Sequence, residues 1–141
     1  AKSEIDMKEK KDRVDDAKEA VISALEEGVV LGGGCALLNC KDLVVNVLEK
    51  TDEAIGVQLI MKAIEAPFRT ICENAGVSPD LKIEGVMLRP IGYGYNAKTD
   101  EYVDMIDAGI LDPKKVTRIA LESAASVSGT LLTTACALIR K

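Results

Sequence analysis

Two adjacent aspartates, Asp15 and Asp16, are the residues whose type and position best suit acid–base chemistry. The chain contains no histidine, so a general acid or base must be a carboxylate or a lysine. One of the two carboxylates could act as a base or orient a water molecule for attack. The alternative is a solvated acidic pair on an exposed helix face, with Lys11 one turn before Asp15. Spacing alone favours the solvated pair.

Three consecutive glycines, Gly32 to Gly34, form the second candidate site. Glycine reaches backbone conformations with positive φ and lets a ligand approach the main chain closely. A helix is predicted from about Cys35 to Glu49, and its unpaired N–H groups and dipole would point back at the glycines, as in an anion site. The spacing matches neither G-x-G-x-x-G nor G-x-x-x-x-G-K-[ST]. A tight turn between two helices is therefore the favoured alternative on spacing alone.

Composition excludes several classes of protein. The four cysteines lack C-x-x-C spacing and no histidine accompanies them, which predicts reduced, mostly buried thiols and no metal site. The net charge of -5 argues against binding to nucleic acid or to an anionic membrane surface. No apolar run approaches the roughly 20 residues that span a bilayer, and the first residues show no signal-peptide pattern.

A long helix must position the aspartates. Its predicted start is Ser3 or Asp6, the latter with Glu9 in a capping-box pattern, and its predicted end is Glu27. The first half of this helix is charged on all sides. The second half carries an apolar stripe, made of Val14, Ala17, Val21, Ala24 and Leu25. We expect the helix to begin in solvent and to end in a core.

Two further helices are predicted in the middle of the chain. Apolar residues at helical spacing run from near Asp52 to Gly76, a typical C-terminal cap, with a kink or break expected at Pro67. Ser78 and Pro79 then suit the N-cap and the first position of a short helix.

The last part of the chain changes period. Alternation between Ile91 and Val103 predicts a short β-hairpin with its turn at residues 97–100. Asp112 is predicted to be the N-cap, and Pro113 the first residue, of a last long helix. Periodicity does not decide whether residues 131–139 continue that helix or form a strand.

Five segments follow one another at the spacing seen in group I chaperonins, the GroEL family: residues 8–17, 26–34, 65–67, 94–97 and 109–118. The sequence resembles that family over essentially all 141 residues, but only in the C-terminal part of the family's chain. The resemblance implies a mainly α-helical, multihelical bundle of the chaperonin equatorial-domain type with one short β-hairpin. Residues 1–27 would be a helix of the intermediate domain, and residues 28–141 the C-terminal half of the equatorial ATPase domain.

The resemblance also implies an ATP site. Asp16 matches the family's catalytic aspartate, which orients the attacking water. The positions that match nucleotide contacts are Gly33 through its backbone, Asn96 and Ala97 on the base side, Lys98 as the third hairpin contact, and Asp112 on the ribose hydroxyls. Lys98 departs from the small residue that the family has there. Mg²⁺ would be held by residues outside this sequence.

The function implied by the resemblance is that of an ATP-driven, stress-responsive chaperonin that encloses unfolded polypeptides in seven-membered rings. Unfolded polypeptides and a GroES-type co-chaperonin would bind through regions absent here, in the bacterial cytoplasm or in an organelle such as the mitochondrion. Neither nucleic acid nor a membrane is an expected partner. Because the family's phosphate loop and magnesium-binding aspartate are absent, we expect this fragment alone not to hydrolyse ATP. The alternative is a stand-alone helical interaction module with a vestigial nucleotide groove.

Overall fold

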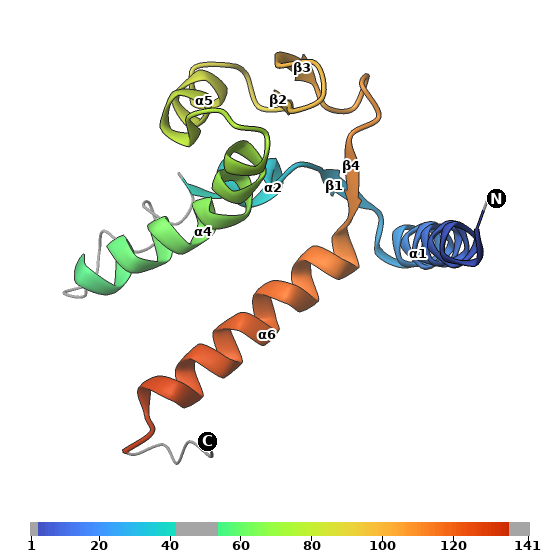
Figure 1. The fold of residues 1–141 in the computed structure, drawn as a ribbon. Coiled ribbons are helices and arrows are strands. Elements are labelled where there is room, and N and C mark those ends of the chain that lie inside the picture. Colours follow the sequence, from blue (N-terminus) through green and yellow to red (C-terminus); the bar gives the residue numbers. More distant parts are fainter. Residues whose placement is uncertain (1–2, 42–53, 136–141) are drawn as a thin grey trace. The chain divides into compact units, whose positions relative to one another are not determined.

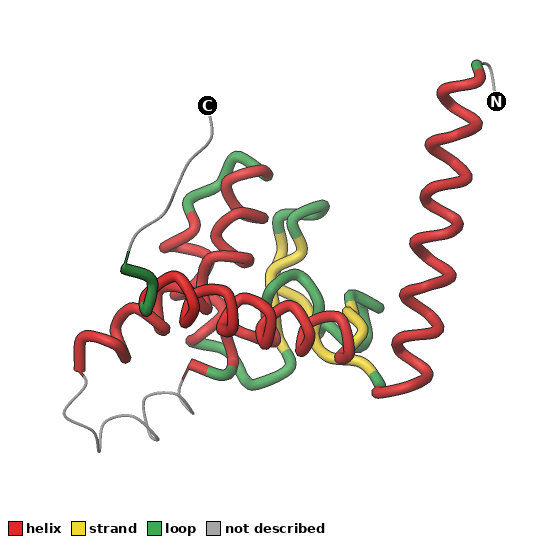
Figure 2. The backbone as a smooth tube through the Cα atoms, turned by 90° about the horizontal axis from the view of Figure 1, so that it is seen from below, coloured by secondary structure: helices red, strands yellow, loops and turns green. Residues whose placement is uncertain are grey.

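The computed structural model describes residues 3–41 and 54–135, and within them the chain is mainly α-helical. In chain order the elements are α1 (Glu4–Glu27), β1 (Val29–Leu31), α2 (Cys35–Asn39), α4 (Ala54–Asn74), α5 (Pro79–Met87), β2 (Tyr93–Asn96), β3 (Glu101–Asp104), β4 (Leu111–Pro113) and α6 (Lys114–Leu132) (Figure 1). The strands form two pairs, β1 with β4 and β2 with β3 (Figure 2). The predicted mainly α-helical fold and its hairpin are confirmed, whereas the β1–β4 pair was not predicted.

The chain divides into two compact units. The terminal unit combines Ala1–Val29 with Pro113–Lys141 and contains α1 and α6. The central unit, Val30–Asp112, contains α2, α4, α5 and the hairpin. Each unit is held together by its own side-chain and backbone contacts.

In the terminal unit, α1 begins and ends close to its predicted limits. Ser3 is the N-cap, and its hydroxyl accepts a hydrogen bond from the Asp6 N–H at 3.1 Å. The capping box predicted from Asp6 to Glu9 is therefore wrong, because Asp6 already lies in the first turn. At the other end, Gly28 has a φ of 83° and donates its N–H to the carbonyl of Ala24.

The predicted apolar stripe of α1 does not form a core among the described residues. Val14, Val21 and Leu25 are 66%, 59% and 83% exposed, and no residue of α1 is buried. The expectation that this helix ends in a core is wrong for the described part of the chain.

Ion pairs join the C-terminal end of α1 to the first turns of α6. Arg118 donates to both carboxylate oxygens of Glu27, at 3.0 and 2.6 Å, and its other nitrogen reaches Glu122 at 2.9 Å. Lys115 pairs with Glu26. The hydrogen bond from Arg118 lowers the pKa of Glu27 below its ordinary value. A bidentate arginine–carboxylate pair has a defined geometry, so the two helix ends are oriented as well as attracted.

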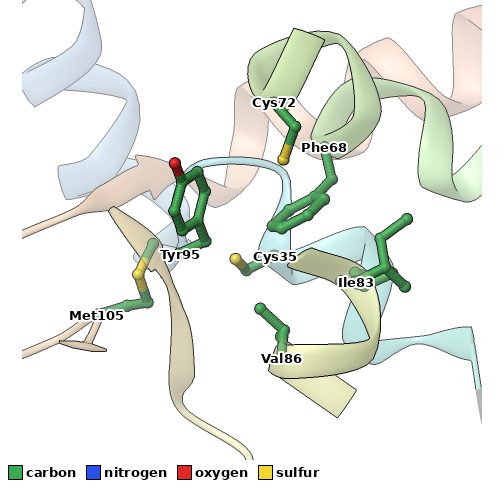
Figure 3. Close-up of a cluster of buried hydrophobic side chains, with 8 residues drawn as sticks. Cys35, Phe68, Cys72, Ile83, Val86, Tyr95 and Met105 are labelled. Carbon is green, nitrogen blue, oxygen red and sulfur yellow. The ribbon is translucent and has the colours of Figure 1, made fainter. Parts of the chain in front are cut away.

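The core of the central unit is one cluster of buried side chains from α2, α4, α5, β2 and the segment after β3: Cys35, Leu38, Phe68, Cys72, Ile83, Val86, Tyr95 and Met105 (Figure 3). Phe68 packs its ring edge-on to Tyr95, with the ring centroids 6.5 Å apart. Full burial stabilises a side chain of this size by about 1.5–3 kcal/mol. The two buried cysteines are free thiols, as predicted from the sequence.

Helix α4 runs through Pro67 without the break that the proline predicts. On the two sides of the proline, Ile64, Phe68 and Cys72 face the same way at four-residue spacing and are all buried. Their burial outweighs the hydrogen bond that the proline cannot donate. The helix ends as predicted near Gly76, which has a φ of 74°. The N–H groups of Gly76 and Val77 donate to the carbonyls of Glu73 and Cys72, which is a Schellman cap.

The predicted starts of α5 and α6 have different outcomes. Ser78 and Pro79 begin α5 as expected, although the Ser78 side chain makes no capping hydrogen bond. The predicted N-cap at Asp112 is wrong, because Asp112 lies in β4 and Pro113 occupies the N-cap of α6. Pairing of β4 with β1 keeps Asp112 in an extended conformation, where the local sequence predicts the start of a helix.

The sequence left open whether residues 131–139 are helix or strand. Helix α6 ends at Leu132, so this segment begins as helix. Residues 136–139 lie outside the described part of the chain.

Glu65 is buried in α4 and accepts hydrogen bonds from Lys41 and Arg69. Arg69 lies 2.8 Å from it and pairs also with Asp80 at 2.7 Å, which links α4 to α5. Burial by itself raises the pKa of Glu65, but the two hydrogen bonds outweigh burial and hold the pKa below its ordinary value of 4.5. The carboxylate is therefore charged in the folded protein at neutral pH.

Replacing Glu65 with glutamine should lower the free energy of unfolding by about 2 kcal/mol at pH 7, since two cations lose a charged acceptor but remain partly solvated. The folded-state pKa lies below the unfolded one, so this stabilisation is complete above about pH 4.5 and is lost as the pH falls through the folded value. Urea unfolding at pH 7 and at pH 3 measures the difference, which should shrink in acid. Glu73→Gln, an exposed position on the same helix, should change stability by less than about 0.5 kcal/mol at both pH values.

Candidate functional site

Each glycine of the triplet faces a different segment of the central unit. A Cβ on Gly32 would lie 2.9 Å from the carbonyl oxygen of Ile110, and one on Gly34 would lie 2.8 Å from the backbone nitrogen of Phe68. A Cβ on Gly33 would meet Met105 Cε at 3.5 Å and the Tyr95 carbonyl oxygen at 3.9 Å. The loop therefore contacts three segments at once: the residues just before β4, the hairpin, and α4. Only backbone without side chains fits between them.

The loop leads into α2 with two residues in the left-handed conformation, Gly33 at a φ of 62° and Gly34 at a φ of 76°. The Gly32 N–H donates to the Ile110 carbonyl at 2.9 Å, and the Gly32 carbonyl accepts from the Cys35 N–H at 3.1 Å. Helix α2 ends at Asn39, earlier than the predicted limit of Glu49, and residues 42–49 lie outside the described part of the chain.

The hairpin turn holds the three positions that match nucleotide contacts by resemblance, namely Asn96 and Ala97 on the base side and Lys98 as the third contact. The Asn96 side-chain oxygen accepts the Lys98 N–H at 3.0 Å, and the Asn96 carbonyl accepts the Asp100 N–H at 2.9 Å. Ala97 and Lys98 are exposed at the tip. The strands pair antiparallel, with Asn96 opposite Glu101 and Tyr95 opposite Tyr102. The Asn96 side-chain oxygen and its carbonyl oxygen both brace the turn, which leaves Ala97 and Lys98 exposed beside them.

Asp112 lies two residues after Ile110, whose carbonyl accepts the hydrogen bond from the Gly32 N–H. Its side chain is exposed, and surrounding protein atoms desolvate the carboxyl group enough to raise its pKa above 3.8. Burial raises the pKa of the Cys35 thiol, and the nearby Asp112 carboxylate adds to that effect. Among the described residues, no side chain donates a hydrogen bond to this carboxylate, so it can accept one from a ligand hydroxyl.

The central unit contains Gly33, the turn from Asn96 to Lys98, and Asp112. Gly33 approaches the Tyr95 carbonyl, next to Asn96, and the neighbouring Gly32 bonds to Ile110, two residues before Asp112. Asp16 belongs to the terminal unit, where it lies exposed on α1, as does Asp15. The predicted nucleotide positions and the predicted catalytic aspartate therefore lie on separate units.

Sequence reasoning did not single out Asp100, whose carboxylate bonds to Lys82 of α5 and to Tyr95. Among the described residues it is the non-glycine residue with positive φ, at 58°. The sequence did offer a signal for this role. Asp100 is the last residue of the predicted four-residue turn, and aspartate tolerates the left-handed backbone conformation better than most residues.

Within residues 3–41 and 54–135, no group of three histidine, cysteine or acidic side chains is arranged to hold a metal ion. No described helix is long and apolar enough to cross a membrane. The expectation that Mg²⁺ is held by residues outside this sequence stays a prediction.

Comparison with known proteins relates this chain to one family and to solved structures. The sequence matches the model of the TCP-1/cpn60 chaperonin family over residues 2–141. The structure is similar to the crystal structure of a group III chaperonin in the open state, with a TM-score of 0.74 and 29% sequence identity over 82% of this chain. The match covers 25% of the solved chaperonin chain, so this sequence spans about a quarter of that protein's length. The mainly α-helical bundle with its hairpin is thus of the chaperonin equatorial type, and the chain belongs to the TCP-1/cpn60 chaperonin family.

Proposed function

We propose that residues 28–141 are the C-terminal half of the equatorial ATPase domain of a chaperonin subunit that assists protein folding, and that residues 1–27 are a helix of its intermediate domain. The observation that carries the proposal is that the glycine loop lies against the hairpin at Tyr95 and is bonded to Ile110, two residues before Asp112. These are three of the segments that, by resemblance, hold a nucleotide. Membership of the chaperonin family supports the same function.

The residues at the site fit parts of a nucleotide. Gly33 offers backbone in a conformation that leaves no side chain in the way of a phosphate or sugar. Asp112 is an exposed carboxylate able to accept hydrogen bonds from ribose hydroxyls. Asn96 and Ala97 lie at the hairpin tip, where backbone groups can meet the base, and Lys98 follows them with an exposed side chain. ATP bound here would supply the phosphoryl group for hydrolysis, with Asp16 orienting the attacking water.

The remaining parts of the proposal concern the longer protein. Mg²⁺ is proposed to be held outside these residues, and the subunits are proposed to assemble into seven-membered rings that enclose unfolded polypeptides with a GroES-type co-chaperonin. The proposed location is the bacterial cytoplasm or an organelle such as the mitochondrion. These 141 residues alone are proposed not to hydrolyse ATP, because positioning and a charge-neutralising metal carry most of phosphoryl-transfer catalysis.

The test is Asp112→Ala in the full-length protein, with ATP and its 2′,3′-dideoxy analogue as ligands. Loss of a charged acceptor for the ribose hydroxyls should weaken ATP binding by about ten- to 100-fold, since hydrogen bonds to charged groups contribute about 1.5–3 kcal/mol. The dideoxy analogue lacks those hydroxyls, so it should bind the parent and the variant with similar affinity. Isothermal titration calorimetry measures all four affinities.

Asp107→Ala is the matched control, since Asp107 is an exposed aspartate of the same unit. It should leave both affinities unchanged. Equal losses of ATP and dideoxy analogue in Asp112→Ala would mean that the carboxylate does not contact the ribose. A parent protein without measurable ATP affinity would overturn the proposed function as a whole.

A further inference from the structure

A cluster of side chains anchors the tip of the hairpin to α5. The Asp100 carboxylate accepts hydrogen bonds from Lys82 Nζ at 2.5 Å and from the Tyr95 hydroxyl at 2.9 Å. Lys82 Nζ also lies 4.4 Å from the centroid of the Tyr95 ring and 5.4 Å from that of Tyr102. The Lys82 side chain is only 16% exposed. One lysine of α5 is therefore held by both strands of the hairpin and by its turn.

Asp100 sets the direction of the turn. Its φ of 58° is in the left-handed region, which a non-glycine residue enters only when its surroundings favour it. Its N–H donates to the Asn96 carbonyl at 2.9 Å and closes the turn. The residues between these two groups are Ala97, Lys98 and Thr99. A contact that holds Asp100 in place therefore also holds the backbone of residues 97–99 in place.

Helix α5 and the hairpin are docked without free space between them. A Cβ on Gly85 would lie 2.1 Å from the Tyr102 hydroxyl oxygen, so the tyrosine occupies the place of a side chain on α5. The Arg89 guanidinium lies 3.7 Å from the centroid of the Tyr102 ring. Because this contact is close, the helix and the strands offer Lys82 a rigid base from which to hold the turn.

The anchor is charged at neutral pH. The hydrogen bond from Lys82 lowers the pKa of Asp100, and the hydrogen bond from Tyr95 lowers it further. The hydrogen bond to Asp100 raises the pKa of Lys82. A charge-assisted hydrogen bond of this kind is shorter and stronger than a neutral one.

We propose that Lys82 and Asp100 are positioning residues, which hold the turn from Asn96 to Lys98 in the orientation that receives the nucleotide base. Neither side chain needs to touch the ligand. Their effect passes through the closed turn, so the affinity of the site for adenine nucleotides depends on a contact with α5. This inference rests on the proposed nucleotide site.

The test is Lys82→Met in the full-length protein, which keeps an unbranched stem beside Tyr95 but removes the cation. The KM for ATP should rise by about three- to ten-fold, the effect of one charge-assisted hydrogen bond, while kcat stays within about two-fold of the parent. The dissociation constant for ADP should rise by the same factor, because the turn faces the base and not the γ-phosphate. Hydrogen exchange of the amides of residues 97–100 should be faster, with the amides of Phe68 and Cys72 unchanged.

Asp100→Asn removes the charge from the other side of the pair and keeps a residue that tolerates the left-handed conformation. It should raise the same KM, and it replaces Lys82→Met in the comparison if that variant fails to fold. The double variant should lose little more than either single one, since the two residues act through one contact. Lys62→Met, at an exposed lysine of α4, is the matched control and should leave KM unchanged.

Additive effects of the two substitutions, or an unchanged KM in both variants of a parent that binds ATP, would overturn the positioning role alone. A lowered kcat with unchanged KM would overturn it too. A parent that binds no nucleotide would instead show that the proposed site is wrong, and this inference would fall with it.

Discussion

Asp16→Ala in the full-length protein should lower ATP hydrolysis by on the order of 100-fold or more, the size of a general-base contribution, while ATP binding stays nearly intact. Asp16 is exposed on α1, and none of the nucleotide positions lies on that helix. Twelve residues separate Asp16 from Gly28, which places the carboxylate roughly 18 Å from the helix end at 1.5 Å per residue.

We expect a carboxylate so far along a helix to reach a nucleotide only if the helix swings as a lever in the full-length protein. Gly28 suits the pivot, because its φ is 83° and a Cβ there would meet nothing within 4 Å. Hinges of this type lie at the ends of elements and absorb the change in backbone angles. The swing would deliver Asp16 only after the nucleotide is bound, which is why the substitution should affect the rate and not the affinity.

Asp15→Ala is the control, since its side chain points about 100° around the helix from that of Asp16. It should change the rate of hydrolysis little. Single-turnover hydrolysis and equilibrium ATP binding distinguish the two outcomes. Equal losses of rate in both variants, or a loss of ATP affinity in Asp16→Ala large enough to explain its rate, would mean that the carboxylate is structural.

Gly34→Ala should destabilise the central unit by about 3 kcal/mol or more, the sum of a left-handed backbone penalty and an overpacked contact. The φ of Gly34 is 76°, and a Cβ there would lie 2.8 Å from the Phe68 nitrogen and 3.0 Å from its Cα. Both neighbouring atoms are backbone in the middle of α4, so they cannot move aside as a side chain would. Relief requires α4 to shift away from the glycine loop, which opens the cluster around Phe68.

The control for Gly34→Ala is Gly56→Ala, on α4 in the same unit. A Cβ on Gly56 would meet nothing within 4 Å, and alanine in a helix is about 1 kcal/mol more favourable than glycine. Amide hydrogen exchange of Phe68, Cys72 and Tyr95 reports the stability of the core directly. Exchange should accelerate in Gly34→Ala and slow slightly in Gly56→Ala, and unchanged exchange in Gly34→Ala would show that the loop has room to relax.

Local signals gave Ser3 as one of two candidate starts of α1, and they predicted the end of α4 at Gly76, the start of α5 at Ser78 and Pro79, and the β2–β3 hairpin. Each depends on interactions within a few residues, such as the Ser3 hydroxyl with the Asp6 N–H, so the sequence contains all that is needed. The order of the chaperonin-like segments likewise identified the family, because it is a property of the chain and not of its contacts.

What the sequence could not decide depended on distant partners. Asp112 has a good N-cap pattern, but pairing with β1, some eighty residues earlier, keeps it in a strand. Pro67 predicts a kink or a break, but the burial of Phe68 and Cys72 in the central cluster keeps the helix continuous. In both cases a local preference of a few kcal/mol or less competes with nonlocal burial or pairing of similar size, and only the folded chain decides which prevails.

The candidate site divides in the same way. The sequence alone determined which residues carry carboxylates, glycine backbone and a turn, and the resemblance to chaperonins assigned them to ATP. Only the tertiary structure decided that the glycine loop lies against the hairpin and is bonded to the segment before Asp112, and that Lys82 holds the turn through Asp100. Positions 82 and 100 are far apart along the chain and come together because α5 packs on the hairpin, a contact that leaves no periodic or capping signal in the sequence.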